Sequence, residues 1–193
     1  MATNCSSSAA RSTPRPSRPR RRGAAAAVRS VGADVALPKP SPLAIDLETG
    51  RVRLGDYPAV ISPAMPIGAL REHFATWVSG GRDIGNDYEW VSLSHMRLAD
   101  RPAWMSLCFF EGRLTMLTLG VSLPDDEEEE GWPTEGTSQR QVAFLRHALE
   151  RQLGRSMAGG PAQFEWGGAW ANFDHKGFMA SAGLHYEPKR RGS

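Results

Sequence analysis

Apolar residues recur at two different spacings along residues 41–193. In 44–54 and in much of 88–123 they alternate with polar residues, which is typical of half-buried strands. In 138–153 they fall three or four positions apart, which predicts an amphipathic helix. Its apolar face consists of Val142, Leu145, Leu149 and Leu153.

The first part of this pattern predicts a strand pair and a helix. Residues 44–54 form two short apolar runs around Gly50, which can supply the positive φ of a tight connection. In 62–78, Ile67, Leu70, Phe74 and Trp77 lie on one helical face, and Pro66 suits the first turn. We expect the glycine-rich segment 79–87 to end this helix.

The centre of the chain predicts a β-hairpin. Glu111 and Gly112 stand between two apolar runs, 103–110 and 113–121, at the spacing of a two-residue turn. Strands are also expected at 88–94 and around 95–98. Both faces of the hairpin are largely apolar near the turn, which suggests a central pair covered on both sides.

The last third predicts a second helix and a final strand pair. Ser138 and Gln141 fit a capping box, and Gly154 is placed to end the helix. Residues 164–173 and 178–186 then read as two strands joined by the polar turn 174–177.

The predicted fold is α+β. We expect a single antiparallel sheet of about six to eight strands with two helices packed on one face. Residues 41–188 would form one globular domain, and 189–193 a frayed C-terminus. Residues 1–40 are rich in Ser, Pro, Arg and Ala, which predicts a disordered basic tail.

Charge divides the chain at the same place. Residues 1–40 hold seven Arg and one Lys against one acid, a net charge of +7, whereas 41–193 hold 15 basic and 20 acidic residues, a net charge of −5. The tail is interpreted first as an unstructured extension. A targeting segment and a nucleic-acid contact are the alternatives.

Motifs for catalysis or cofactor binding are absent from the sequence. It has no phosphate-binding glycine motif, no CxxC and no closely spaced histidine pair, so we expect no cofactor and no metal. Cys108, in an apolar strand pattern, is interpreted as a packed side chain rather than a nucleophile. No stretch is long and apolar enough for a membrane span, and we expect a cytoplasmic location.

The most distinctive polar feature is a run of acids. Asp125, Asp126, Glu127, Glu128, Glu129 and Glu130 are consecutive, and Trp132 follows closely. One interpretation is a solvated loop that favours solubility. The other is a negative patch that steers a basic partner, with Trp132 as an interface anchor. Trp77, Trp104 and either Trp166 or Trp170 could instead all serve the core.

A resemblance to known proteins suggests which class of binding protein the second interpretation would imply. The segment 131–186 carries a capped helix, a strand with Trp170, the turn Asp174-x-Lys176-Gly177 and a final strand with Gly183 and Tyr186. This pattern resembles small bacterial proteins, some of which look like immunity partners of secreted toxins. The resemblance implies a fold rather than catalytic residues.

Three functional hypotheses follow. The first is a non-enzymatic, immunity-type binding protein that uses its acidic surface against a basic protein partner. The second is a small-molecule-binding protein or enzyme with a pocket between sheet and helices, lined by His95, His185 or Asp174. The third is a nucleic-acid-associated protein that acts through the Arg-rich tail.

Overall fold

The computed structural model describes residues 40–175 and 179–187. The predictions for the basic tail, for the frayed C-terminus and for Lys176 and Gly177 lie outside these residues. Within the described residues, no helix is both long enough and apolar enough to cross a membrane.

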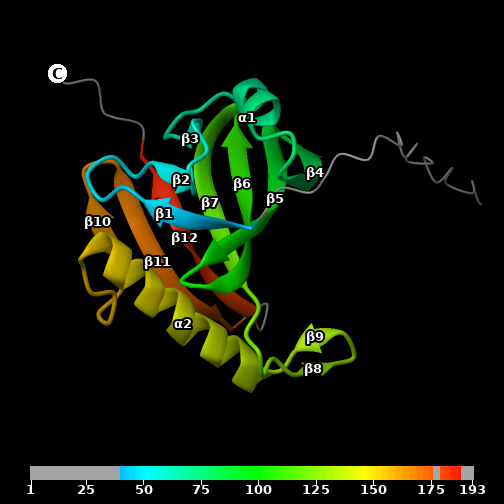
Figure 1. Ribbon diagram of the computed structural model, residues 1–193, viewed down its shortest axis with the longest axis vertical. Helices are drawn as coiled ribbons and strands as arrows, with labels where there is room; N and C mark the ends of the chain where they lie inside the picture. The colour runs from blue at the N-terminus through cyan, green and yellow to red at the C-terminus, as the bar shows by residue number, and fades with distance from the viewer. Residues whose placement is uncertain (1–39, 176–178, 188–193) are drawn as a thin grey trace, which may run out of the picture. The chain divides into compact units, whose positions relative to one another are not determined.

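The chain contains two helices and twelve strands in its described part (Figure 1). In chain order they are β1 (Ser41–Ile45), β2 (Val52–Leu54), β3 (Val60–Ile61), α1 (Ile67–His73), β4 (Val78–Gly85), β5 (Tyr88–Leu98), β6 (Arg101–Phe110), β7 (Arg113–Val121), β8 (Glu128–Glu129), β9 (Trp132–Pro133), α2 (Glu135–Leu153), β10 (Ala162–Phe164), β11 (Gly167–Asp174) and β12 (Met179–Tyr186).

Ten of the strands form one sheet in the order β10-β11-β12-β7-β6-β5-β1-β2-β3, with β4 paired to β5. The α+β class is therefore confirmed, but the prediction of six to eight strands was too low. The sheet is also not wholly antiparallel, because β1 pairs with β5 in parallel at Ser41↔Met96 and Pro42↔Arg97. A separate hairpin, β8–β9, lies within the acidic segment.

A bulge in β5 lets the same edge of this strand pair with two different strands. Residues 88–93 of β5 pair with β4, and 96–97 pair with β1. Between them the register against β6 shifts, and His95 adopts a φ of +63°. Such a bulge bends the strand and raises its twist. The two strands predicted at 88–94 and 95–98 are thus one strand with an irregularity.

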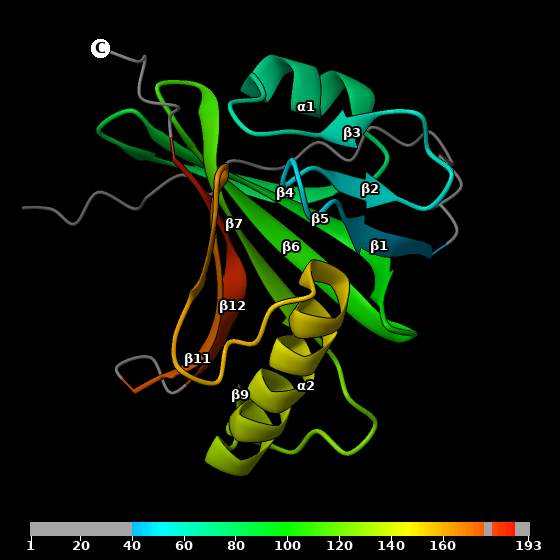
Figure 2. The ribbon, with the colours of Figure 1, turned by 90° about the vertical axis from the view of Figure 1, so that its left-hand side faces the viewer.

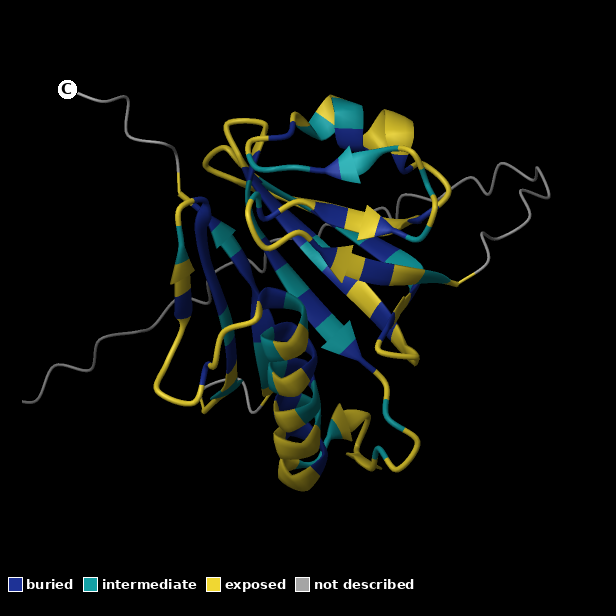
Figure 3. Cartoon of the chain, turned by 60° about the vertical axis from the view of Figure 1, so that its left-hand side comes forward, coloured by how far each residue is buried: buried dark blue, intermediate teal, exposed yellow. Residues whose placement is uncertain are grey.

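Helix α2 lies against β11, β12, β7 and β1, whereas α1 lies at the other end of the curved sheet, beside β3 (Figure 2). One continuous core contains Leu70 and Phe74 near α1, Leu145 and Leu149 of α2, and inward side chains of β6 and β7 such as Leu107. Figure 3 shows the burial of α2 along one side and its exposure along the other. Neither of the two described helices covers the opposite face of β6. On that face Trp104 is exposed and Cys108 is buried, so the prediction of a pair covered on both sides holds only in part.

Helix α2 begins earlier than its sequence signal suggested. Thr134 is the N-cap, and its hydroxyl accepts a hydrogen bond from the backbone N–H of Thr137 at 3.2 Å. Ser138 is fully buried inside the first turns rather than capping them. Gly154 ends the helix in the left-handed conformation, as predicted.

The segment predicted as one long helix and a glycine loop divides differently. Only Ile67–His73 is helical, and Val78–Gly85 forms β4. All eight residues of β4 are exposed, so the strand has no apolar alternation that a sequence pattern could reveal.

The final strands pack where the sequence predicted them, with a later start. Phe164 belongs to β10, and β11 begins at Gly167. Trp166 is buried and donates from Nε1 to the Leu47 carbonyl at 3.0 Å. Tyr186 donates to the Gly50 carbonyl at 2.9 Å. These two aromatic residues therefore fix the β1–β2 turn to the C-terminal strands.

Candidate functional site

The acidic segment forms a small hairpin on the surface. We call residues 125–133 the acidic hairpin. Its two strands pair at Glu128↔Pro133 and Glu129↔Trp132, and the turn residues Glu130 and Gly131 both have positive φ. The prediction of a loop without regular structure was wrong at this point. Five of the six acids are exposed, and Asp126 is half-buried.

Hydrogen bonds hold the base of the acidic hairpin against the start of α2. Asp126 Oδ2 accepts from the Leu123 N–H and from Gln141 Nε2, both at 2.8 Å. The Glu127 N–H donates to the Thr137 hydroxyl at 2.9 Å, and Arg140 donates to the Asp125 carbonyl at 2.6 Å. The carboxylates thus stand near the positive end of the helix dipole, which favours negative charge.

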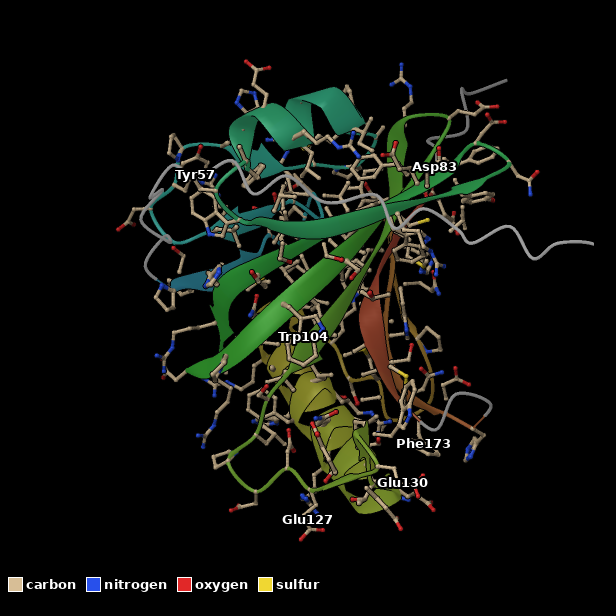
Figure 4. The ribbon with its side chains drawn as sticks, turned by 90° about the vertical axis from the view of Figure 1, so that its right-hand side faces the viewer. Tyr57, Asp83, Trp104, Glu127, Glu130 and Phe173 are labelled. Atoms are coloured by element: carbon tan, nitrogen blue, oxygen red, sulfur yellow. The ribbon has the colours of Figure 1, made fainter. Side chains whose placement is uncertain are left out.

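A cavity of about 520 Å³ lies beside the acidic hairpin. It opens where β7 and β12 separate: β12 pairs with β11 along its whole length but with β7 only over Ala182–His185. Side chains from β6, β7, α2, β12 and the hairpin line it, including Trp104, Asp126, Glu128, Gln141, Met179 and Ser181. Figure 4 shows Trp104 on the open face of the sheet, above the hairpin residues Glu127 and Glu130.

The described lining is negative and partly apolar. It contains the carboxylates of Asp126, Glu128 and Asp174 and no Lys, Arg or His. Oδ1 of Asp126 is buried without a hydrogen-bond donor among the described residues. Because the negative charges face a concave surface, the local potential favours a cationic group.

The exposed large apolar side chains form two groups, and Leu47 stands apart from both. Near the cavity and hairpin they are Trp104, Trp132 and Met179, which we call the groove patch; Trp132 is the most exposed, at 66%. The others, Val78, Ile84, Tyr88 and Phe110, come from β4, from the start of β5 and from the end of β6. Exposed apolar side chains gathered in this way are typical of protein interaction surfaces.

Two of the tryptophans predicted for the core are in it, and one is not. Trp77 and Trp166 are buried, whereas Trp104 is 45% exposed. The sequence contained one signal for this exposure of Trp104. Its side chain lies on the same strand face as Ser106, and at a distance from the hairpin turn that face carries polar residues.

The histidines predicted for a small-molecule pocket do not line this cavity. His95 lies at the β5 bulge, and His185 lies 6.2 Å from the ring of Trp170. Only Asp174 of the three predicted pocket residues contributes to the lining. In the described part of the chain, no group of three or more His, Cys, Asp or Glu side chains could hold a metal ion.

Cys108 is buried on β6, and its surroundings do not activate it. Burial raises the pKa of its thiol, and the neighbouring Thr115 hydroxyl donates to the Cys108 carbonyl at 3.2 Å. A raised pKa lowers the thiolate fraction, and the burial is that expected of a packed side chain.

Comparisons with known proteins find a weak likeness to a solved structure. No protein-family model matches the sequence, and no curated protein matches it. A chain of the structure "Rhs1-CT in complex with cognate immunity protein RhsI1" is similar at a TM-score of 0.42 and 10% identity, over 78% of this chain and 90% of that one. That complex contains an immunity protein.

Proposed function

We propose that this protein is a non-enzymatic, immunity-type binding protein that holds a basic protein partner at the acidic hairpin and the adjoining cavity. The observation that carries the proposal is the juxtaposition of a pinned acidic hairpin with a negatively lined cavity flanked by exposed tryptophan. The immunity-type role itself rests on the sequence resemblance of residues 131–186.

Electrostatics supports a basic partner. Residues 41–193 carry a net charge of −5, and the acidic hairpin concentrates six of their 20 acids in one segment. Charge complementarity of this kind raises the association rate and excludes acidic competitors. Because three hydrogen bonds attach the hairpin to α2, its charges are positioned before a partner arrives, which lowers the entropy cost of ordering the interface on binding.

The groove patch supplies the apolar part of such an interface. Trp104 and Trp132 are large, stiff side chains, and tryptophan is enriched among residues that dominate binding energy. An arginine or lysine side chain of the partner could enter the cavity between the Trp104 ring and the carboxylates of Glu128 and Asp174.

The experiment uses the full chain and the products of the genes adjacent to its own. Binding of each purified product is measured by calorimetry over a salt series, with a Glu128→Lys/Glu129→Lys/Glu130→Lys variant. We expect one basic product to bind, with affinity that falls as salt rises and weakens by ~10-fold or more in the variant. The matched control changes three exposed glutamates elsewhere, Glu48→Lys/Glu111→Lys/Glu165→Lys.

Three results would count against the proposal. They are no binding of any neighbouring product, binding that is insensitive to salt, and equal weakening by the two triple variants.

The cavity also favours a second candidate, a small-molecule-binding protein. Its volume of about 520 Å³ lies in the range of ligand pockets, about 300–1,000 Å³. Thermal-shift screening with small organic cations would support this candidate if one of them raised the Tm and Trp104→Ala removed the effect. No shift with any cation would count against it.

A further inference from the structure

The cavity beside the acidic hairpin offers hydrogen-bond acceptors on several of its walls. The carboxylates of Glu128 and Asp174 come from the hairpin and from the end of β11, and Asp126 lies at the base of the hairpin. On β7 the Thr118 hydroxyl donates to the Ser106 carbonyl at 3.4 Å, which leaves the hydroxyl oxygen as an acceptor. This lining suits a cation that presents donors in several directions.

Trp104 adds an aromatic wall to the same cavity. Its indole lies over Gly120, where a Cβ would stand 2.1 Å from Cε2 and 2.4 Å from both Cζ2 and Nε1. One side of the ring is thus turned toward the sheet, while Trp104 remains 45% exposed. In residues 40–175 and 179–187 no cation lies over this ring, because the cation–π contact found there joins Arg155 to Phe164.

An aromatic wall opposite carboxylates distinguishes arginine from lysine. Both side chains carry one positive charge, so the negative lining attracts them alike. The guanidinium of arginine is planar, presents five donors, stacks on aromatic rings and is weakly hydrated. The ammonium of lysine is compact, presents three donors and is strongly hydrated. Entry into a partly apolar cavity therefore costs arginine less hydration and gives it more contacts.

We propose that this cavity selects arginine over lysine. An arginine side chain of the partner inserts, stacks its guanidinium on Trp104 and forms hydrogen bonds with the acceptors of the lining. The proposed function, on which this inference rests, treats the two basic residues as equivalent. In this pocket the carboxylates select a positive charge, and Trp104 determines which positive side chain binds best.

NMR titration of the full chain, with no partner present, tests the preference. The probes are N-acetyl-arginine amide and N-acetyl-lysine amide, which carry the same charge and imitate a residue within a chain. We expect the arginine probe to shift the Trp104 indole N–H signal and to bind with a Kd lower by ~5-fold or more. Equal Kd values, tighter binding of the lysine probe, or no saturable shift with either probe would overturn the proposal.

Three variants separate stacking from charge. Trp104→Leu should reduce the ratio of the two Kd values to less than about 2-fold, because the stacking surface is lost while the carboxylates remain. Glu128→Gln should weaken both probes by a similar factor, because both carry one positive charge. The matched control is Phe110→Leu, which changes another exposed aromatic side chain of β6, outside the cavity lining, and should keep the ratio. A ratio that survives Trp104→Leu, or that falls equally in Phe110→Leu, would overturn the role of Trp104.

Free L-arginine distinguishes a residue of a protein from a small-molecule ligand. Its α-carboxylate would meet the negative lining, so it should bind more weakly than N-acetyl-arginine amide. Tighter binding of free L-arginine would overturn the assignment to a partner side chain. Binding of a neighbouring gene product together with equal probe Kd values would remove the arginine preference alone. An arginine preference in a chain that binds no such product would instead count against the proposed function.

Discussion

Trp104 lies over Gly120, its cross-strand partner on β7, so closely that a Cβ at position 120 would stand 2.1 Å from the indole Cε2. The glycine has an ordinary backbone conformation, so its role is space rather than turn geometry. By leaving room for the ring, Gly120 holds Trp104 flat against the sheet at the edge of the cavity. Gly120 therefore controls the shape of the proposed binding surface through the position of the Trp104 ring.

The first prediction tests this control. Gly120→Ala should push the Trp104 ring outward, change its indole N–H resonance in NMR spectra and weaken partner binding. Because the ring is already half exposed, the free energy of unfolding should fall by only about 1 kcal/mol, the low end for overpacking. Adding Gly120→Ala to Trp104→Leu should lower the free energy of unfolding no further than Trp104→Leu does alone. If Gly120→Ala lowers it as much in this background as in the wild type, the two residues are not coupled.

The second prediction concerns Gly50 in the β1–β2 turn. Its φ is +66°, and a Cβ there would stand 2.5 Å from Cδ2 of the buried Trp166. Gly50→Ala should therefore lower the free energy of unfolding by about 2–4 kcal/mol, from left-handed backbone strain and a steric clash together. Gly112→Ala is the matched control, with a φ of +72° and open space around its Cβ position, and should lose only about 1–2 kcal/mol. Urea unfolding distinguishes them, and equal losses would contradict the clash.

The third prediction is a loss of stability at high pH that depends on Tyr186. Burial raises the pKa of its phenol well above the usual value of 10.0, and the hydroxyl donates to the Gly50 carbonyl. The unfolded chain releases this proton near pH 10 while the folded chain keeps it. The stability that the buried Tyr186 phenol contributes to the folded state is therefore fully present below about pH 10. It is lost as the pH rises toward the pKa of this phenol in the folded chain.

Urea unfolding between pH 8 and about pH 11.5 measures this effect. The wild type should lose stability steadily above about pH 10, and Tyr186→Phe should lose less over the same range. At neutral pH the variant should be less stable by about 1 kcal/mol, because the buried Gly50 carbonyl loses its donor. Parallel pH profiles for the two proteins would contradict the assignment to Tyr186.

Local signals predicted the elements that bury one face. The β6–β7 hairpin followed from Glu111 and Gly112, which both adopt positive φ in the structure, and α2 followed from its apolar spacing and Gly154. Two of the elements missed, β4 and the β8–β9 hairpin, have no buried face. β4 is exposed throughout and rich in glycine, and the β8–β9 hairpin is built largely from acids, so neither carries a hydrophobic period.

The sequence predicted the charged residues of the candidate site but not its cavity. The acids and Trp132 were visible as a local run, whereas the cavity arises where β7 and β12, far apart in sequence, stop pairing. Trp104 was grouped with core tryptophans because its strand is apolar on both sides near the turn. Its exposure depends on which sheet face the helices cover, and that is a property of the assembled layers rather than of any segment.

The last prediction separates the six acids by role. Asp126 Oδ2 accepts one hydrogen bond from Gln141 of α2 and one from the Leu123 N–H, whereas Glu129 is exposed and takes part in neither ion pair found in the described part of the chain. Asp126→Ala should lower the free energy of unfolding by about 1–3 kcal/mol, since two donors lose their acceptor. Glu129→Ala should change it by less than about 0.5 kcal/mol, because the Glu129 side chain is exposed and such surface substitutions usually have effects of this size. Equal losses in urea unfolding at pH 7 would show that the hairpin is not attached through Asp126. A large loss for Asp126→Ala with little change for Glu129→Ala would mean that the exposed Glu129 is not needed for stability and is available for a partner.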